Sequence, residues 1–305
     1  MATDQLVVLN KDEDTLSIID VASGETVTVV ETAFNPHEVA VGPDGDRVYV
    51  TCSQGGKLLV YDTDTWELQA TLEHEHFQFP HGLAVRASAG ELWMVATRSS
   101  YVFVIDLETA EILDVFPTHQ DKSHMVALDA DERYAYLANI GSDSVTVIDC
   151  EERRIIADPP VGESPEGIAV HPTAGVLVSN QDDDYLSVLD TETLEEANRA
   201  LLGETPIRVV LSPDTRYALV PNRESHDVSV IDCTFDLGGE TRPWEIKRIP
   251  VGRWPGGTTF AADGETAFVA NNKTNDISVI DIASLTEVDR FEAGIHPDGI
   301  AYLHR

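Results

Sequence analysis

Histidine and carboxylate side chains occupy one recurrent position in this sequence, directly after a proline or serine that ends a short polar segment. His37, His81 and His124 take this position in three successive segments, and Glu166 takes it in the fourth. Neutral imidazoles bind copper, zinc or iron, and a carboxylate can complete the ligand set while leaving a position open for water or substrate. These four residues therefore predict an open transition-metal site, with copper, zinc or iron as the cofactor.

Further polar residues lie near the same segments. His76 and His119 fall in the connections that lead to two of the predicted ligands, and Arg208 follows a later proline of the same pattern. We expect His76, His119 and Arg208 to bind an anionic substrate or transfer protons, and Glu166 to serve as a ligand, a general base or a group that fixes an imidazole tautomer. Because metal-bound water supports hydrolysis and a redox metal supports oxidation, the first prediction is a metal-dependent hydrolase or oxidoreductase.

A repeat defines the elements that must position these side chains: an apolar pair followed by aspartate recurs seven times. The aspartates are Asp20, Asp62, Asp106, Asp149, Asp190, Asp232 and Asp281, at successive spacings of 42, 44, 43, 41, 42 and 49 residues. Each unit also holds a proline turn with an apolar strand, a Gly/Asp turn and a second strand. Four short strands in each such unit are typical of a β-propeller blade. The aspartates themselves precede tight turns and are expected to cap backbone N–H groups.

The two ends of the sequence complement each other. Three strands, at about 5–10, 15–21 and 26–31, lack an opening strand, and a strand at about 299–303 lacks the other three. We predict that they share one blade, because such a clasp removes the free edges of an open ring. The sequence thus predicts an all-β, seven-bladed β-propeller with four-stranded blades, as a single domain over residues 1–305. The residue after each opening proline should line the central channel, so the predicted metal ligands and a small-molecule substrate meet at its mouth.

The repeat unit resembles the YVTN-type β-propeller repeat, most closely in DGETAFVAN at 263–271 and VID at 279–281. That family includes surface-layer proteins, binding scaffolds and redox-associated proteins, so a non-catalytic scaffold that holds a protein partner is one alternative. A metal-free enzyme is another. His124, Glu166 and Arg208 could serve as acid, base and carboxylate clamp, an arrangement that resembles seven-bladed lactonases.

The charge of the protein restricts its partners. It carries 54 acidic and 20 basic residues, a formal net charge of −34, with no basic stripe, which argues against nucleic acid and anionic membrane as partners. The acidic residues are spread over every repeat and lysine is scarce, a pattern that resembles proteins of halophilic archaea. Three cysteines without a CxxC spacing indicate neither a disulfide framework nor a zinc site. No secretory signal is visible at the first residues, so we expect a cytoplasmic protein, and a monomer.

Overall fold

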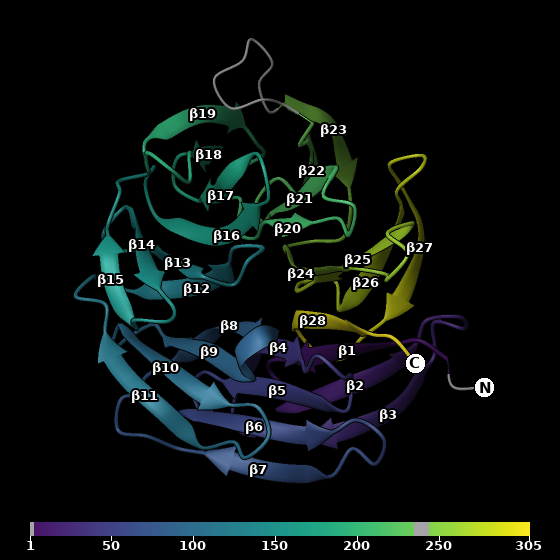
Figure 1. Cartoon of the computed structure of the whole chain (residues 1–305). Helices are drawn as coiled ribbons and strands as arrows, with labels where there is room; N and C mark the ends of the chain where they lie inside the picture. Colours follow the sequence, from purple (N-terminus) through teal and green to yellow (C-terminus); the bar gives the residue numbers. More distant parts are fainter. Residues whose placement is uncertain (1–2, 235–243) are drawn as a thin grey trace.

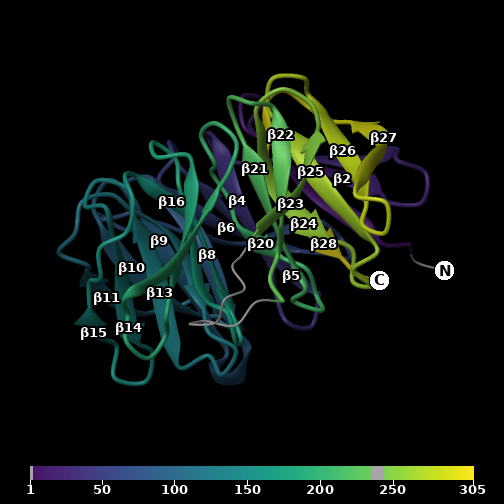
Figure 2. The ribbon, with the colours of Figure 1, turned by 90° about the horizontal axis from the view of Figure 1, so that it is seen from above.

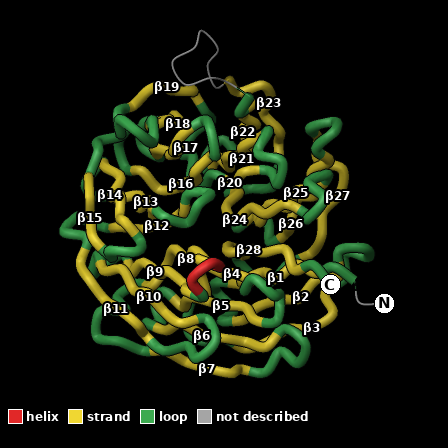
Figure 3. The backbone as a smooth tube through the Cα atoms, in the orientation of Figure 1, coloured by secondary structure: helices red, strands yellow, loops and turns green. Residues whose placement is uncertain are grey.

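Seven four-stranded antiparallel sheets form a ring in the computed structural model, which describes residues 3–234 and 244–305 (Figure 1). Each sheet is one propeller blade, and the blades follow one another around the ring in chain order. The predicted all-β, seven-bladed fold is confirmed. The described residues contain a single short 3₁₀ turn, η1 (Ala87–Ala89), drawn in red in Figure 3. None of the described residues belongs to a helix of the length and apolarity needed to cross a membrane.

In every blade the strands succeed one another from the channel outward. The first blade has β28 (Pro297–Leu303), β1 (Gln5–Asn10), β2 (Thr15–Asp20) and β3 (Thr26–Glu31), and the second has β4 (Pro36–Val41), β5 (Arg47–Cys52), β6 (Lys57–Asp62) and β7 (Leu68–Leu72). The third has β8 (Pro80–Arg86), β9 (Glu91–Ala96), β10 (Tyr101–Asp106) and β11 (Ile112–Pro117), and the fourth has β12 (Ser123–Leu128), β13 (Tyr134–Asn139), β14 (Ser144–Asp149) and β15 (Arg154–Ala157). The fifth has β16 (Pro165–His171), β17 (Gly175–Asn180), β18 (Tyr185–Leu189) and β19 (Glu196–Leu201). The sixth has β20 (Val210–Leu211), β21 (Tyr217–Asn222), β22 (Asp227–Asp232) and β23 (Trp244–Pro250), and the seventh has β24 (Pro255–Phe260), β25 (Thr266–Asn271), β26 (Asp276–Asp281) and β27 (Thr286–Glu292).

The last strand closes the ring, as predicted. β28 pairs antiparallel with β1, so that Leu6 lies opposite Tyr302 and Val7 opposite Ala301. The segments at the two ends of the sequence therefore complete the first blade, and β28 lies beside β1 in Figure 1; Figure 2 shows the same ribbon turned by 90°.

The repeated aspartates and asparagines hold turns rather than a site. Asp62 accepts the backbone N–H of Thr65 at 2.8 Å, and each of the other six aspartates of the repeat accepts a backbone N–H two or three residues later. The asparagines that end several second strands behave alike: the Asn10 Nδ2 donates to Ser17 Oγ at 2.8 Å. The expected capping role of the aspartates is confirmed, which leaves the channel as the place where the blades differ.

The core lies between neighbouring blades, because each sheet buries both of its faces. Tyr49 of β5 packs with Met94 of β9 and Phe103 of β10 across one such interface, and all three are buried. Apolar side chains on both faces of the two middle strands explain their continuous burial. This packing fixes the blades and therefore the inner strands that line the channel.

A β-bulge near the start of the inner strand decides what faces the channel. Pro36 pairs with Cys52 and Glu38 with Thr51, so His37 has no partner of its own, and the same shift recurs in other blades. A bulge re-aims side chains, so two consecutive residues can point into the channel. Glycine occupies the second of these positions in four blades because the neighbouring inner strand comes close: a Cβ on Gly167 would lie 2.6 Å from Arg208 Cα.

Candidate functional site

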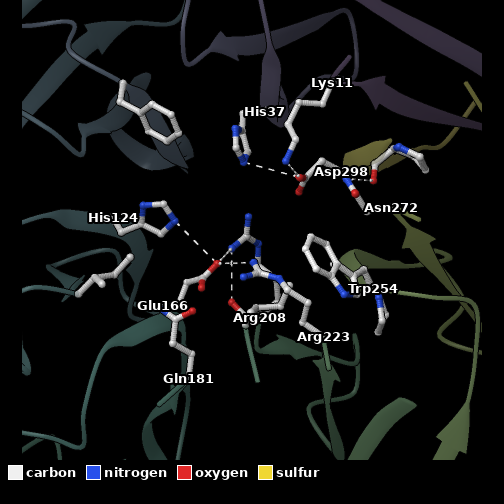
Figure 4. A pocket seen from close by; sticks show the side chains of 16 residues that line it. Lys11, His37, His124, Glu166, Gln181, Arg208, Arg223, Trp254, Asn272 and Asp298 are labelled. Carbon is white, nitrogen blue, oxygen red and sulfur yellow. Dashed lines mark hydrogen bonds and ion pairs between the residues drawn. The ribbon is translucent and has the colours of Figure 1, made fainter. Parts of the chain in front are cut away.

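A cavity of about 360 Å³ lies at the end of the channel where the second strands of the blades finish. Its polar lining comes from two rings of equivalent positions, the residue after the opening proline and the residue after the second strand (Figure 4). The first ring contributes His37, His124, Glu166, Ile207, Gly256 and Asp298, and the second contributes Lys11, Ile140, Gln181, Arg223 and Asn272. Phe79, Trp254 and Arg208 complete most of the remaining wall. We call this end of the channel the mouth.

Three imidazoles from the second, third and fourth blades lie against one another: His81 and His124 stack, and His37 is tilted by 56° relative to His81. The ring centroids of His37 and His81 lie 4.5 Å apart, and those of His81 and His124 lie 3.7 Å apart. Loss of hydration lowers the pKa of His37 to about 4 and the pKa values of His81 and His124 well below their usual range. All three rings are therefore neutral near pH 7.

The His124 ring is fixed at its inner nitrogen. The Nδ1 atom lies 2.9 Å from the hydroxyl of Thr97, the residue after β9. When that hydroxyl donates to Nδ1, the ring proton resides on Nε2, which lies 3.9 Å from Glu166 Oε1. In this tautomer His124 presents an N–H to the cavity beside a carboxylate.

A buried ion-pair network forms the floor of the cavity. Arg208 Nη1 lies 3.2 Å from Glu166 Oε1, and its other terminal nitrogen contacts Glu38, which lies 3.7 Å from His81. Burial raises the pKa of Glu38 to about 7, although the charge of Arg208 opposes this shift. Burial also opposes the charge of Arg208, but the two carboxylates hold its pKa above the usual value. Glu38 and Arg208 line a smaller cavity of about 160 Å³ farther along the channel, and Arg208 lines both cavities, so it lies between the two compartments.

A second network lies on the opposite wall. Lys11 Nζ is 2.7 Å from Asp298 Oδ2, and His37 Nε2 is 3.6 Å from the same oxygen (Figure 4). Burial alone would raise the pKa of Asp298, but the charges of Lys11, His37 and Arg208 hold that pKa well below its usual range. Asp298 is therefore ionised near pH 7.

The structure brings most of the predicted metal ligands together without arranging them around one point. His37, His124 and Glu166 line the cavity, whereas His81 is buried between the two other rings. Over residues 3–234 and 244–305, no three His, Cys, Asp or Glu side chains form a group that could hold one metal ion. The His81 and His124 rings are stacked and the His37 ring is tilted by 56° relative to His81, an arrangement that does not direct the imidazole nitrogens toward a common centre.

Two residues predicted to assist catalysis lie away from the cavity lining. His76 stacks on Tyr101, with ring centroids 4.0 Å apart, and His119 is exposed in a turn, where its φ is 62°. Neither is among the residues that form the wall of the cavity. Both belong to connections whose course the repeat does not determine. Their nearness in sequence to His81 and His124 therefore does not place them in the cavity wall.

Sequence reasoning missed Glu38, Lys11 and Arg223. Strand alternation places Glu38 on the face opposite to His37, and only the bulge turns it toward the channel. A signal was available nonetheless, because Glu38 and Arg208 occupy a position that is glycine in four blades. Lys11 and Arg223 both directly follow the asparagine that ends a second strand, which makes them equivalent positions of the repeat.

Comparisons with known proteins support the fold. No family model matches the sequence, and no curated protein sequence matches it. Among solved structures, a functionally unknown protein from Desulfotomaculum acetoxidans superposes with a TM-score of 0.85 at 15% identity, covering 99% of both chains. The periplasmic gluconolactonase PpgL of Pseudomonas aeruginosa superposes with a TM-score of 0.80 at 18% identity, also covering 99% of both chains. Hydrazine synthase of Kuenenia stuttgartiensis gives 0.76 at 17% identity over 92% of each chain. At these identities the likeness concerns the seven-bladed fold, and the resemblance to YVTN repeats stays a prediction.

Proposed function

We propose that the mouth cavity is the active site of a metal-independent hydrolase that opens a small lactone. The observation that carries the proposal is the pair formed by His124 and Glu166, a neutral imidazole and a carboxylate 3.9 Å apart in the cavity wall. Neutral imidazole acts as an electrophile when its pKa is depressed, and a carboxylate held by a guanidinium acts as an oriented base. The gluconolactonase named above and a putative 6-phosphogluconolactonase from Bacteroides fragilis share the fold, which is consistent with this assignment.

In the proposed reaction each group has one step. His124 donates its Nε2 proton in a hydrogen bond to the lactone carbonyl, and this bond strengthens as negative charge develops on that oxygen. Glu166 accepts a proton from the attacking water, whose oxygen forms the new bond to the carbonyl carbon. The ring C–O bond then breaks, the proton passes to the departing alkoxide, and a hydroxy acid leaves. Thr97 is a positioning residue, since it acts on the tautomer of His124.

Hydrolysis of D-glucono-1,4-lactone, followed by acid release, tests the proposal. We expect Glu166→Gln to lower kcat/KM at least about 100-fold and His124→Gln to have a similar effect, as is typical for the loss of a general acid or base. Arg216→Gln is the matched control, because Arg216 precedes β21 and lies at the opposite end of the channel from Arg223, which follows that strand.

A chelator arm separates this proposal from the metal-dependent one. Activity that survives EDTA supports acid–base chemistry by the protein alone. Activity that is lost in EDTA and restored by zinc, copper or iron supports a site built on His37, His81, His124 and Glu166 instead. A rate no higher than the uncatalysed rate refutes lactone hydrolysis and favours a scaffold that holds a protein partner.

A further inference from the structure

Among the cations of the cavity wall, Arg223 has the weakest ion pairing with the described residues. Lys11 is paired with Asp298 at 2.7 Å, and Arg208 is engaged by Glu38, by Glu166 and by the Ile207 carbonyl. Arg223 reaches only Glu166, at 3.5 Å, and its guanidinium donates no hydrogen bond to any described residue. Its side chain is 32% exposed, so its donors face the open part of the cavity.

The surroundings of Arg223 suit an anion with an attached carbon skeleton. Trp254 lies beside it in the cavity wall, with the guanidinium carbon 6.0 Å from an indole ring centroid (Figure 4). Lys273 lies 4.9 Å from an indole ring centroid of the same Trp254 and adds a second positive charge. Three cations, Lys11, Arg208 and Arg223, line the cavity against two carboxylates, Glu166 and Asp298. Glu38, which contacts Arg208, makes three carboxylates for these three cations, so the wall offers the free donors of Arg223 rather than a net charge.

We infer that Arg223 binds the carboxylate of the substrate, which makes the substrate a polyhydroxylated lactone that carries a carboxylate group. This inference rests on the proposed function for its reaction and on Arg223 for its specificity. A guanidinium fork matches the two oxygens of a carboxylate. Gln181 and Asn272 supply amide donors and acceptors for hydroxyl groups, while the indole of Trp254 covers an apolar face of the ring. Arg208, the carboxylate clamp predicted from the sequence, is already occupied by two carboxylates of the protein itself.

Two lactones that differ in one group test the inference. D-glucaro-1,4-lactone has a carboxylate where D-glucono-1,4-lactone has a CH₂OH group. We expect the wild-type protein to prefer the anionic lactone by about 10- to 100-fold in kcat/KM, the usual contribution of a charge-assisted bidentate pair. Arg223→Gln should abolish the preference, which is read as the ratio of kcat/KM for the two lactones because loss of the contact with Glu166 also changes the rate on the neutral lactone. Arg223→Lys should keep part of it, because the charge remains without the fork.

A binding measurement without turnover separates the inference from the reaction. Calorimetry compares acyclic D-glucarate with the neutral D-glucitol, and Arg216→Gln serves as the control, because Arg216 also stacks on an aromatic ring, that of Tyr217 at 4.9 Å. Glucarate that binds at least tenfold more weakly to Arg223→Gln than to the wild type or Arg216→Gln supports the clamp, even if neither lactone is hydrolysed and the proposed reaction fails. Hydrolysis of both lactones at equal rates, or glucarate binding that is absent or unchanged in Arg223→Gln, overturns the inference.

Discussion

Replacing Arg208 by methionine tests how much of the stability of the ring depends on the charges in its channel. Arg208 is 6% exposed and is the cation between Glu38 and Glu166. Methionine keeps an unbranched apolar side chain but leaves both carboxylates without this partner. Breaking a buried ion pair by removing one member costs about 3–5 kcal/mol, because the remaining charge is desolvated and uncompensated. We expect a loss of this size in the free energy of unfolding at pH 8.

The pH dependence of that loss identifies its cause. Glu38 already has a pKa of about 7, raised by burial and opposed by Arg208, so removal of Arg208 raises this pKa further. A carboxyl whose folded pKa exceeds its unfolded value contributes stability that is lost as pH rises through the folded pKa. The variant should therefore lose more than the wild type between pH 6 and pH 8, and its destabilisation should be about 1 kcal/mol smaller at pH 6.

Chemical denaturation at pH 6 and pH 8 measures both quantities. The double variant Arg208→Met/Glu38→Gln should recover a substantial part of the loss at pH 8, since it removes one uncompensated charge. Arg216→Met, at an exposed position, should stay within about 0.5 kcal/mol of the wild type. A destabilisation by Arg208→Met below about 1 kcal/mol at pH 8, or one of equal size at both pH values, would refute the reasoning.

Three further predictions concern other parts of the ring. His37, His81 and His124 have depressed pKa values in the folded protein, so their stability contribution is present above pH 6.5 and is lost as pH falls toward the folded values, about 4 for His37. The free energy of unfolding measured between pH 7 and pH 4 should therefore fall, and it should fall less in a His37→Gln variant. Gly257→Ala should destabilise the fold by several kcal/mol, because the new Cβ would lie 1.9 Å from a backbone oxygen of the neighbouring inner strand. In Gly256→Ala the atom nearest to the new Cβ would be 3.7 Å away, so the thermal midpoint should stay almost unchanged. Equal thermal midpoints of the two variants would contradict the close approach at Gly257. The net charge of −34 predicts a higher thermal midpoint in molar KCl than in dilute buffer, since a Debye length of about 3 Å screens the repulsion, and identical midpoints would count against adaptation to salt.

The fold could be predicted from the sequence because the repeat is consistent at every level. The apolar pair before each aspartate, the proline turn and the spacing all indicate the same four-stranded unit, and the capping by aspartates such as Asp62 follows from local turn chemistry. The shared first blade was also predictable, since the first three strands of the sequence lack an opening strand and the last strand lacks the other three. Periodic patterns therefore determine the ring and the strand order.

The site was only partly predictable because it consists of departures from the repeat. The position after the opening proline or serine predicted that His124 and Glu166 lie at the mouth, and both line the cavity there. The pattern could not reveal that the rings of His81 and His124 stack, or that a bulge turns Glu38 toward Arg208, since both depend on packing across blades. The loop that contains His76 does not follow the repeat, and it places His76 against Tyr101.

Closure of the ring by its final strand also has a consequence for how the protein is made. β1 is made before all the other strands that separate it in sequence from its partner β28. Until β28 has been made, the inner edge of β1 carries unpaired backbone groups, and such edges recruit other strands. Pairing over so long a sequence separation is slow and exposes the growing polypeptide to aggregation. The ring therefore closes only once β28 has been made, and a ribosome that stalls before β28 leaves the first blade without its innermost strand.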